Sequence, residues 1–405
     1  MVLYQKISSQ KLDKMWAYGI TKDTTRQLLK IPNGERIPSL GISRLDVPIP
    51  KLSHDEVLIR VKSSALNYNT LWSSLIHPVS PFQLIQGHVA RNPHDRDHLQ
   101  EYAIFGSDAA GVIVETGPGV REWRIGDHVV VHCNVIKANE NIAQVDGMLP
   151  LSQSIWGYET NFGAFAEFTK VKSNQLIQKP GHISWENAGS FCLTLSTAYR
   201  MLLSKNAYEV KPNDNCLVWG GAGGLGTFAI QLIQIAGGNP VVVVSSDEKA
   251  EICKDLGVKF IVNRAKEDFS DFVDSRGRPN YLKWRKAQKI LEKKGVDSLQ
   301  MVFEHVGKET LGLSLFLLER GGVVVTCAAS SGYNATIDLR YLWMSLKRII
   351  GSHFANYYEA QKAAELIWSE KIKPVIHSVS SINDLPKMAD LMYYGHTYGK
   401  IVFKH

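Results

Sequence analysis

The sequence predicts an α/β protein whose second half is a doubly wound parallel sheet of the Rossmann type and whose first half is rich in β-strands. Strands alternate with helices from residue 215 onward, and a glycine cluster joins the first of these strands to the first helix. Before residue 180, short strand-like runs are separated by Gly and Pro. The 405 residues leave room for two or three domains at about 150 residues each.

The first half contains apolar runs of strand length and pattern. Residues 56–62 (EVLIRVK) alternate apolar and polar side chains, and residues 111–115 and 127–132 add two further runs. The pattern changes near Ser184, where residues 183–203 show helical periodicity and Ser184 is placed to cap the helix.

The second half reads as a βαβ series. We expect helices over residues 225–235 and 247–256, and a polar, charged insertion over residues 264–298. The expected strands are 215–219, 240–244, 259–262, 300–304 and 322–326.

Composition excludes several classes of protein. The formal charge of +7 is scattered, and in its densest run the side chains of Lys286, Lys289 and Lys293 fit the solvated face of a helix, so we expect no nucleic-acid partner. Five widely spaced cysteines without a C-x-x-C pair argue against a disulfide framework or a zinc ribbon. No apolar run resembles a signal peptide or a membrane span, so we expect a cytoplasmic protein that does not bind membranes.

The glycine cluster matches G-x-G-x-x-G between a predicted strand and a predicted helix. Gly221 would form the tight turn, Gly223 would let the backbone approach a pyrophosphate, and Gly226 would let helix and strand pack closely. With Gly224 and Leu225 between them, these residues would leave the phosphates at the helix N-terminus. A glycine-rich turn without a ligand is the alternative.

The end of the second strand selects the nicotinamide cofactor. Ser245, Ser246 and Lys249 stand where NAD-binding units usually place an acid, and hydroxyl and ammonium groups suit a 2′-phosphate. We expect Asp247 to cap the next helix rather than to bind ribose. The sequence therefore favours NADPH over NADH.

The order of the two halves, with the segment from Val210 to Asp214 (VKPND) and the run LVWGGAGGLGTFAIQL, resembles the medium-chain dehydrogenase/reductase superfamily. The resemblance implies a GroES-like catalytic domain over residues 1–190, a Rossmann NADPH-binding domain over 191–349, and a return to the catalytic domain over 350–405. The stretches that carry Cys and His ligands in zinc members read ALNYN (65–69) and GSDAAG (106–111), so we expect no zinc. His88 and His132 remain as weak candidates for metal ligands.

Four longer strings resemble the crotonyl-CoA carboxylase/reductase branch of that superfamily, with Val306 standing where the branch usually has Pro. The strings are residues 155–163 (IWGYETNFG), 303–307 (FEHVG), 340–344 (RYLWM) and 347–356 (KRIIGSHFAN). The resemblance implies that NADPH reduces an α,β-unsaturated acyl-CoA and that CO2 is added to give an alkylmalonyl-CoA, without biotin. The substrate would be crotonyl-CoA, giving ethylmalonyl-CoA, or a longer chain that becomes a polyketide extender unit.

The resemblance also implies roles for individual residues. Asn69 would hydrogen-bond CO2, with Asn67 as the alternative; Glu159 and His353 would hold a water against CO2; and Tyr158 would shield the site. It further implies a homodimer or homotetramer, for which we expect the strand over 323–326 as a pairing edge. Some of the basic residues Arg285, Lys286, Lys347 and Arg348 could serve the phosphates of CoA, although for Arg285 and Lys286 we favour the solvated surface of a helix.

Two other functions fit the same fold. An enoyl-thioester or quinone reductase would consume NADPH independently of CO2. A non-catalytic NADPH-binding module would bind the nucleotide without turning over an enoyl-CoA.

Overall fold

A computed structural model describes residues 13–137 and 140–405, which divide into two compact units. The first unit comprises residues 1–193 and 376–405, and the second comprises residues 194–375. The sequence places the return to the first domain at residue 350, whereas the second unit continues to Val375. The reason is that the strand at 348–351 extends the second unit's sheet, and the helix that follows is anchored within this unit by an ion pair between Glu359 and Arg200.

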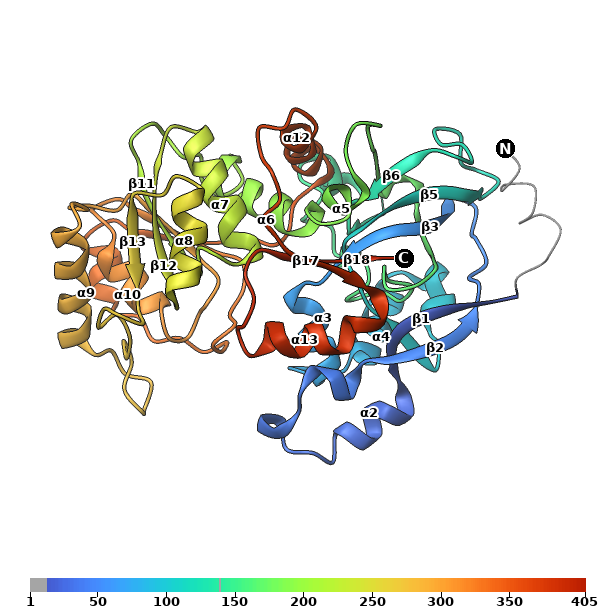
Figure 1. Ribbon diagram of the computed structural model, residues 1–405, viewed down its shortest axis with the longest axis horizontal. Coiled ribbons are helices and arrows are strands. Elements are labelled where there is room, and N and C mark those ends of the chain that lie inside the picture. The colour runs from blue at the N-terminus through green and yellow to red at the C-terminus, as the bar shows by residue number, and fades with distance from the viewer. Residues whose placement is uncertain (1–12, 138–139) are drawn as a thin grey trace. The chain divides into compact units, whose positions relative to one another are not determined.

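The first unit is built from antiparallel sheets, apart from the parallel pair β17 and β18 (Figure 1). A three-stranded sheet has the order β2 (Ser43–Pro48), β1 (Lys14–Thr21), β4 (Tyr102–Ile104). A larger sheet has the order β10 (Leu176–Gln178), β6 (His128–Val131), β5 (Ala109–Thr116), β3 (Glu56–Ala65), β18 (Lys400–Lys404), β17 (Ile376–Ser381), and β9 (Phe168–Lys172) also pairs with β3. The short strands β7 (Asn134–Val135) and β8 (Ser154–Ile155) pair with each other.

The helices of the first unit lie between these strands and cover a core that includes Leu71, Phe105 and Phe403. They are α2 (Lys22–Leu28), α3 (Tyr68–Leu75), α4 (Pro81–Arg91), α5 (Trp185–Ala188) and α13 (Leu385–Tyr393). The three strands predicted in this half are confirmed as β3, β5 and β6, with ends that differ by at most three residues.

The prediction of a single helical run over 183–203 is wrong, because the structure has two helices there with a break between them. Ser184 caps α5, accepting a hydrogen bond from the Asn187 amide, but the helix stops before Gly189. A Cβ on Gly189 would lie 2.7 Å from the Ser63 carbonyl oxygen, so the chain turns close to the sheet there. A new helix, α6 (Cys192–Leu203), then leads into the second unit.

The second unit is a parallel six-stranded sheet, and its strand order is that of a doubly wound dinucleotide-binding fold. The order is β13 (Phe260–Asn263), β12 (Asn239–Val244), β11 (Asn215–Trp219), β14 (Met301–Glu304), β15 (Val323–Thr326), β16 (Arg348–Gly351). The five predicted strands are confirmed to within one residue at each end. The expectation that the strand over 323–326 is a pairing edge is wrong, because β15 lies between β14 and β16.

Helices cover both faces of this sheet (Figure 1). One face packs α9 and α10 against strand residues such as Leu217 and Val241 in a shared core, and α7 and α8 lie on the other. The helices of this unit are α7 (Gly224–Ile235), α8 (Asp247–Asp255), α9 (Tyr281–Lys293), α10 (Leu311–Leu317), α11 (Leu339–Trp343) and α12 (Tyr357–Trp368). The insertion over 264–298 is not wholly polar: α9 buries Trp284 and Leu291, while Lys286, Lys289 and Lys293 are exposed as predicted.

Candidate functional site

Asn69 lies at the beginning of α3, directly after the chain leaves β3. Its Nδ2 donates a 2.8 Å hydrogen bond to Oγ of Ser107, which is buried in the loop between β4 and β5. Its Oδ1 is buried and makes no hydrogen bond within the described chain. Since a hydroxyl can donate or accept, the pair can turn either end of the amide toward a ligand.

Asn67 is the alternative that the sequence leaves open, and both ends of its amide are engaged. Its Nδ2 donates to Asp108 Oδ2 at 2.9 Å, and its Oδ1 accepts from Nζ of Lys400. Of the two asparagines, Asn69 therefore is the one whose amide oxygen has no partner within the described chain.

Tyr158 and Glu159 follow β8 in a loop that packs directly against the loop of Ser107. The contact is made by Gly157 and Gly106: a Cβ on Gly157 would lie 1.9 Å from the Gly106 carbonyl oxygen, and Gly157 has φ +69°. Both Tyr158 and Glu159 are half-buried, and Glu159 Oε2 accepts from the Ile155 amide at 2.8 Å. Because Gly106 precedes Ser107 and Gly157 precedes Tyr158, the loops that carry Ser107 and Tyr158 meet at this contact.

Two buried histidines hold the ends of the loop that carries Tyr158 and Glu159. Nδ1 of His88 lies 3.0 Å from Ser154 Oγ, and the Asn161 amide donates to Nδ1 of His98 at 3.0 Å. Burial holds the pKa of His98 well below its usual value, so its imidazole is neutral and can accept this bond. His88 thus has a structural contact, and the sequence gives no local signal for His98.

His353 lies in the second unit, two residues after β16, and its side chain is exposed. The segment after it is fixed: Phe354 is buried, and Asn356 caps α12 by accepting a hydrogen bond from the Glu359 amide at 3.0 Å. Glu359 is in turn paired with Arg200 at 2.8 Å.

The glycine loop joins β11 to α7, as its motif predicts. The residue with positive φ is Gly220 (+59°), so the tight turn expected at Gly221 falls one position earlier, and Gly221 is instead required because a Cβ would lie 2.8 Å from Val242 Cβ. A Cβ on Gly226 would lie 2.4 Å from the Gly220 carbonyl oxygen, which agrees with the close packing expected there.

Gly223 is less crowded than Gly221 and Gly226, although a Cβ there would still make a tight contact. A Cβ there would have its closest described contact with the Gly220 carbonyl oxygen, at 3.3 Å. Gly223 begins α7 without a side-chain cap, so the first amides of the helix, including those of Gly224 and Leu225, face a space that suits a phosphate. The residues present therefore fit a dinucleotide.

Ser245, Ser246 and Lys249 are brought together after β12. Nζ of Lys249 lies 3.4 Å from Ser245 Oγ, and Ser246 caps α8 by accepting from the Lys249 amide. The cap expected at Asp247 is wrong, because Ser246 holds that position and the Asp247 carboxylate bonds Asn263 and Lys266.

Arg264 is a residue of this region that the sequence reasoning missed. Its amide donates to the Val244 carbonyl at 3.0 Å, because β12 and β13 are parallel with Val244 opposite Asn263. Burial and the charge of Arg264 both lower the pKa of Lys249. The signal was available: the residue after the third strand of a parallel sheet lies beside the residue after the second.

Glu304 and His305, in one of the family strings, tie the end of β14 to the glycine loop. Nε2 of His305 donates to the Trp219 carbonyl at 2.8 Å, and the buried Glu304 carboxylate accepts four hydrogen bonds. One comes from the Val306 amide at 2.7 Å, a donor that a proline at this position would lack. The remaining donors to Glu304 are the amide of Gly307 and the hydroxyls of Thr310 and Ser314.

Two of the basic residues considered for CoA are already paired. Lys347 is buried and donates to the carbonyls of Leu315 and Phe316, and Lys286 pairs with Asp268. Arg285 and Arg348 are exposed.

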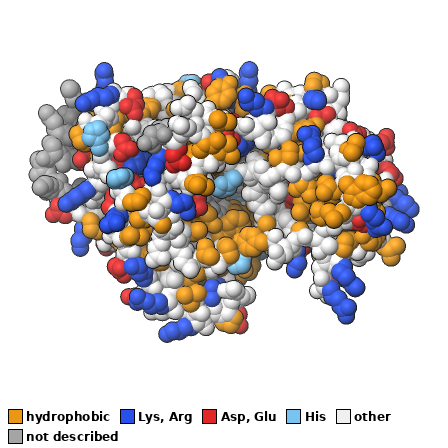
Figure 2. Space-filling model, turned by 180° about the vertical axis from the view of Figure 1, so that it is seen from behind, with side chains coloured by type: hydrophobic (Ala, Val, Ile, Leu, Met, Phe, Trp, Pro, Cys, Tyr) orange, Lys and Arg blue, Asp and Glu red, His pale blue; other side chains and the backbone are white. Residues whose placement is uncertain are grey.

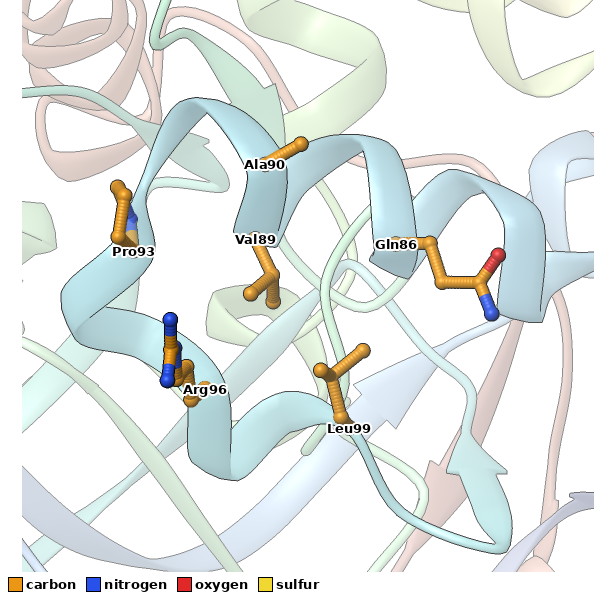
Figure 3. A pocket seen from close by; sticks show the side chains of 6 residues that line it. All are labelled: Gln86, Val89, Ala90, Pro93, Arg96 and Leu99. Carbon is orange, nitrogen blue, oxygen red and sulfur yellow. The ribbon is translucent and has the colours of Figure 1, made fainter.

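A cavity of about 500 Å³ lies on α4 and the short helix after it, Pro93–His98. Figure 3 shows Val89, Arg96 and Leu99 around it, together with Gln86, Ala90 and Pro93. None of the candidate residues lines it.

Two further findings concern metals and membranes. Within residues 13–137 and 140–405, no cluster of three or more His, Cys, Asp or Glu side chains could hold a metal ion. In the same ranges, no helix has the length and apolar character needed to cross a bilayer.

Comparison with known proteins gives consistent matches along the chain. The family described as "Alcohol dehydrogenase GroES-like domain" matches residues 53–181, and "Zinc-binding dehydrogenase" matches residues 224–369. The chain is 42% identical to crotonyl-CoA reductase from Streptomyces avermitilis, over 96% of this chain and 87% of that protein. It is 40% identical to crotonyl-CoA carboxylase/reductase from Cereibacter sphaeroides, over 86% of this chain and 79% of that protein.

A solved structure is similar over the whole fold. It is the 2-octenoyl-CoA carboxylase reductase CinF in complex with NADP and 2-octenoyl-CoA; the apo structure of CinF is described as coming from a Streptomyces species. The TM-score to the complex is 0.93 at 37% identity, with 99% of this chain and 90% of that chain covered.

Proposed function

The chain belongs to the crotonyl-CoA carboxylase/reductase family, and from this premise we propose that it reductively carboxylates an α,β-unsaturated acyl-CoA. NADPH supplies a hydride to the β-carbon of the enoyl thioester. The resulting enolate attacks CO2 at the α-carbon, so one carbon–carbon bond forms and the product is an alkylmalonyl-CoA. The balance needs neither biotin nor a metal.

The observation that carries the proposal is the Asn69–Ser107 pair, which meets the loop of Tyr158 and Glu159 at the Gly106–Gly157 contact. CO2 is small and neutral, so its position depends on a few fixed donors. The Asn69 amide would donate to one CO2 oxygen, and Glu159 would hold a water on the other. Tyr158 would exclude bulk water, which would otherwise protonate the enolate.

Cofactor choice follows from the second unit. The first amides of α7 would hold the pyrophosphate, and Ser245, Ser246, Lys249 and Arg264 would hold the 2′-phosphate that distinguishes NADPH from NADH.

The test is the mass of the product. The protein is incubated with NADPH and crotonyl-CoA or trans-2-octenoyl-CoA, with and without bicarbonate and carbonic anhydrase. We expect a bicarbonate-dependent gain of one carboxyl group beyond the two reducing hydrogens. Saturated acyl-CoA at a rate indifferent to bicarbonate would establish a plain reductase instead, and nucleotide binding without turnover would establish a binding module.

Asn69→Ala tests the residue that carries the proposal. We expect the product to shift from alkylmalonyl-CoA toward saturated acyl-CoA while NADPH oxidation continues. Asn383→Ala, an exposed asparagine of the same unit, is the control and should keep the parental product. An Asn69→Ala protein with the parental product would contradict the role given to this amide.

We also propose that the chain assembles into a homodimer or homotetramer through the free edge of β16. Among the described strands β16 pairs with β15 alone, and apolar side chains nearby are exposed, with Trp343 at 66%. Leu339, Met344 and Leu346 are exposed as well. Figure 2 shows hydrophobic side chains gathered on the surface of the second unit. Light scattering should give two or four chains of 45.2 kDa each, and a single chain would contradict the proposal.

A further inference from the structure

A buried lysine contacts the two segments that carry Asn69 and Ser107. Lys400, on β18, is 2% exposed, and its Nζ donates to Asn67 Oδ1, to Asp108 Oδ2 at 3.1 Å and to the Leu66 carbonyl at 3.3 Å. An ammonium group is costly to bury unless it is paired and hydrogen-bonded. Here it meets three acceptors, one of them a carboxylate.

The partners of Lys400 are themselves fixed. Asp108 is fully buried, and its Oδ1 accepts from the Leu193 amide at 2.7 Å while its Oδ2 accepts from Asn67 at 2.9 Å. Asn67 stands at the N-cap of α3, yet its side chain makes no capping bond. An asparagine there normally stabilises the helix, and in this chain it bonds Lys400 and Asp108 instead.

Strand pairing delivers Lys400 to this place. β18 runs antiparallel to β3 with Val402 opposite Ala65, and the Leu66 amide donates to the Ile401 carbonyl at 2.9 Å. Continuing that register sets Lys400 beside Asn67.

The two partners lie next to the two residues of the candidate pair. Asn67 is two residues before Asn69, and Asp108 directly follows Ser107. Lys400 therefore holds both segments that carry the Asn69–Ser107 hydrogen bond.

We propose that Lys400 is a positioning residue for CO2: by holding Asn67 and Asp108 it fixes the Asn69 amide where CO2 binds. The inference rests on the function proposed for Asn69. Because CO2 carries no charge, the amide must be aimed, and a displacement of about 1 Å can cost up to a hundredfold in rate. Burial lowers the pKa of Lys400, and the Asp108 carboxylate opposes this shift.

The test is Lys400→Met, with crotonyl-CoA, NADPH and varied bicarbonate in the presence of carbonic anhydrase. We expect the apparent KM for CO2 to rise by about tenfold or more. The carboxylated fraction of the product should fall, while the KM for NADPH stays unchanged. This fraction is a ratio within the folded enzyme, so a loss of folded protein lowers both products equally and does not move it.

A second buried lysine provides the matched control. Lys170 lies in the same unit and pairs with Glu56 at 3.0 Å and with Asp97, without contacting Asn67 or Asp108. Lys170→Met should lower stability and keep the parental product ratio. Lys400→Arg keeps the charge and should recover part of the carboxylated fraction.

Should Lys400→Met not fold, the double variant Lys400→Met/Asp108→Asn removes both buried charges and gives the same readout. Its carboxylated fraction should also be low, because Asn67 Oδ1 still lacks its donor. A parental ratio and a parental KM for CO2 in the folded Lys400 variant would overturn the inference, as would an equal shift in Lys170→Met. A wild-type protein that never carboxylates would refute the proposed function and, with it, the role of Lys400.

Discussion

The two units prepare for their ligands in different ways. The second unit uses backbone: residues 220–226 make a turn, a close packing and a row of helix amides within seven positions. The first unit uses side chains, and the lysine that holds Asn67 lies 333 residues away in the chain. Ligand recognition by backbone groups can therefore be predicted from a local motif. Ligand recognition by side chains depends on which segments the sheet brings together.

We expect the largest effect from a substitution of Gly157, where the two loops of the first unit meet. In Gly157→Ala a Cβ would collide with the Gly106 carbonyl oxygen at 1.9 Å, in a residue whose φ is +69°. We expect a melting temperature lower by several degrees and a carboxylated fraction reduced by about tenfold or more. Gly34→Ala, where a Cβ meets nothing within 4 Å, is the control for calorimetry and product analysis. A parental melting temperature in Gly157→Ala would contradict the packing of the two loops.

In the second unit, two glycines of one motif should behave differently. Gly226→Ala places a Cβ 2.4 Å from the Gly220 carbonyl oxygen and should destabilise the protein without any ligand. Gly223→Ala meets its closest described atom at 3.3 Å, a milder contact, so it should lower the melting temperature less than Gly226→Ala does while the Kd for NADPH rises by about tenfold. Fluorescence titration measures that Kd, and unchanged binding in Gly223→Ala would argue against a phosphate at this point.

In the second unit, the affinities for NADPH and NADH test the roles of individual side chains. Lys249→Ala and Arg264→Ala should each weaken the binding of NADPH by about tenfold, which corresponds to the loss of one charge-assisted hydrogen bond. The affinity for NADH should stay unchanged. Lys254→Ala, at the other end of α8, is the matched control. Equal losses for both nucleotides would show that these residues do not contact the 2′-phosphate.

The smallest expected effect concerns Lys347, the second unit's counterpart to Lys400. Lys347 donates to carbonyls rather than to a carboxylate, and burial lowers its pKa from 10.5 to about 8. Between these values the unfolded chain binds more protons at this residue than the folded chain does, so its contribution to stability rises with pH. The melting temperature of the wild type minus that of Lys347→Met should therefore increase from pH 8 to pH 10. A constant difference would contradict this expectation.

Most of the second unit could be read from the sequence. Its strands and the helix after the glycine motif follow from the periodicity of apolar residues and from the Gly and Pro residues between them, because each βαβ unit is a local arrangement. The sequence reasoning missed details that depend on neighbours distant in the chain. The helix breaks at Gly189 because the backbone there lies against Ser63, and β16 rather than β15 is an edge strand of the sheet.

The sequence by itself determined the two-part α/β fold, the glycine loop and the strings that place the chain in its family, because these are carried by residues close together in the chain. Tertiary structure decided that Asn67 is engaged by Lys400 and Asp108 while Oδ1 of Asn69 makes no hydrogen bond within the described chain, and that Arg264 lies beside Lys249. It also decided that Lys400, on the last strand of the first unit's sheet, contacts both Asn67 and Asp108. The physical reason is that a buried polar group is defined by its partners, and those partners come from strands that are distant in sequence.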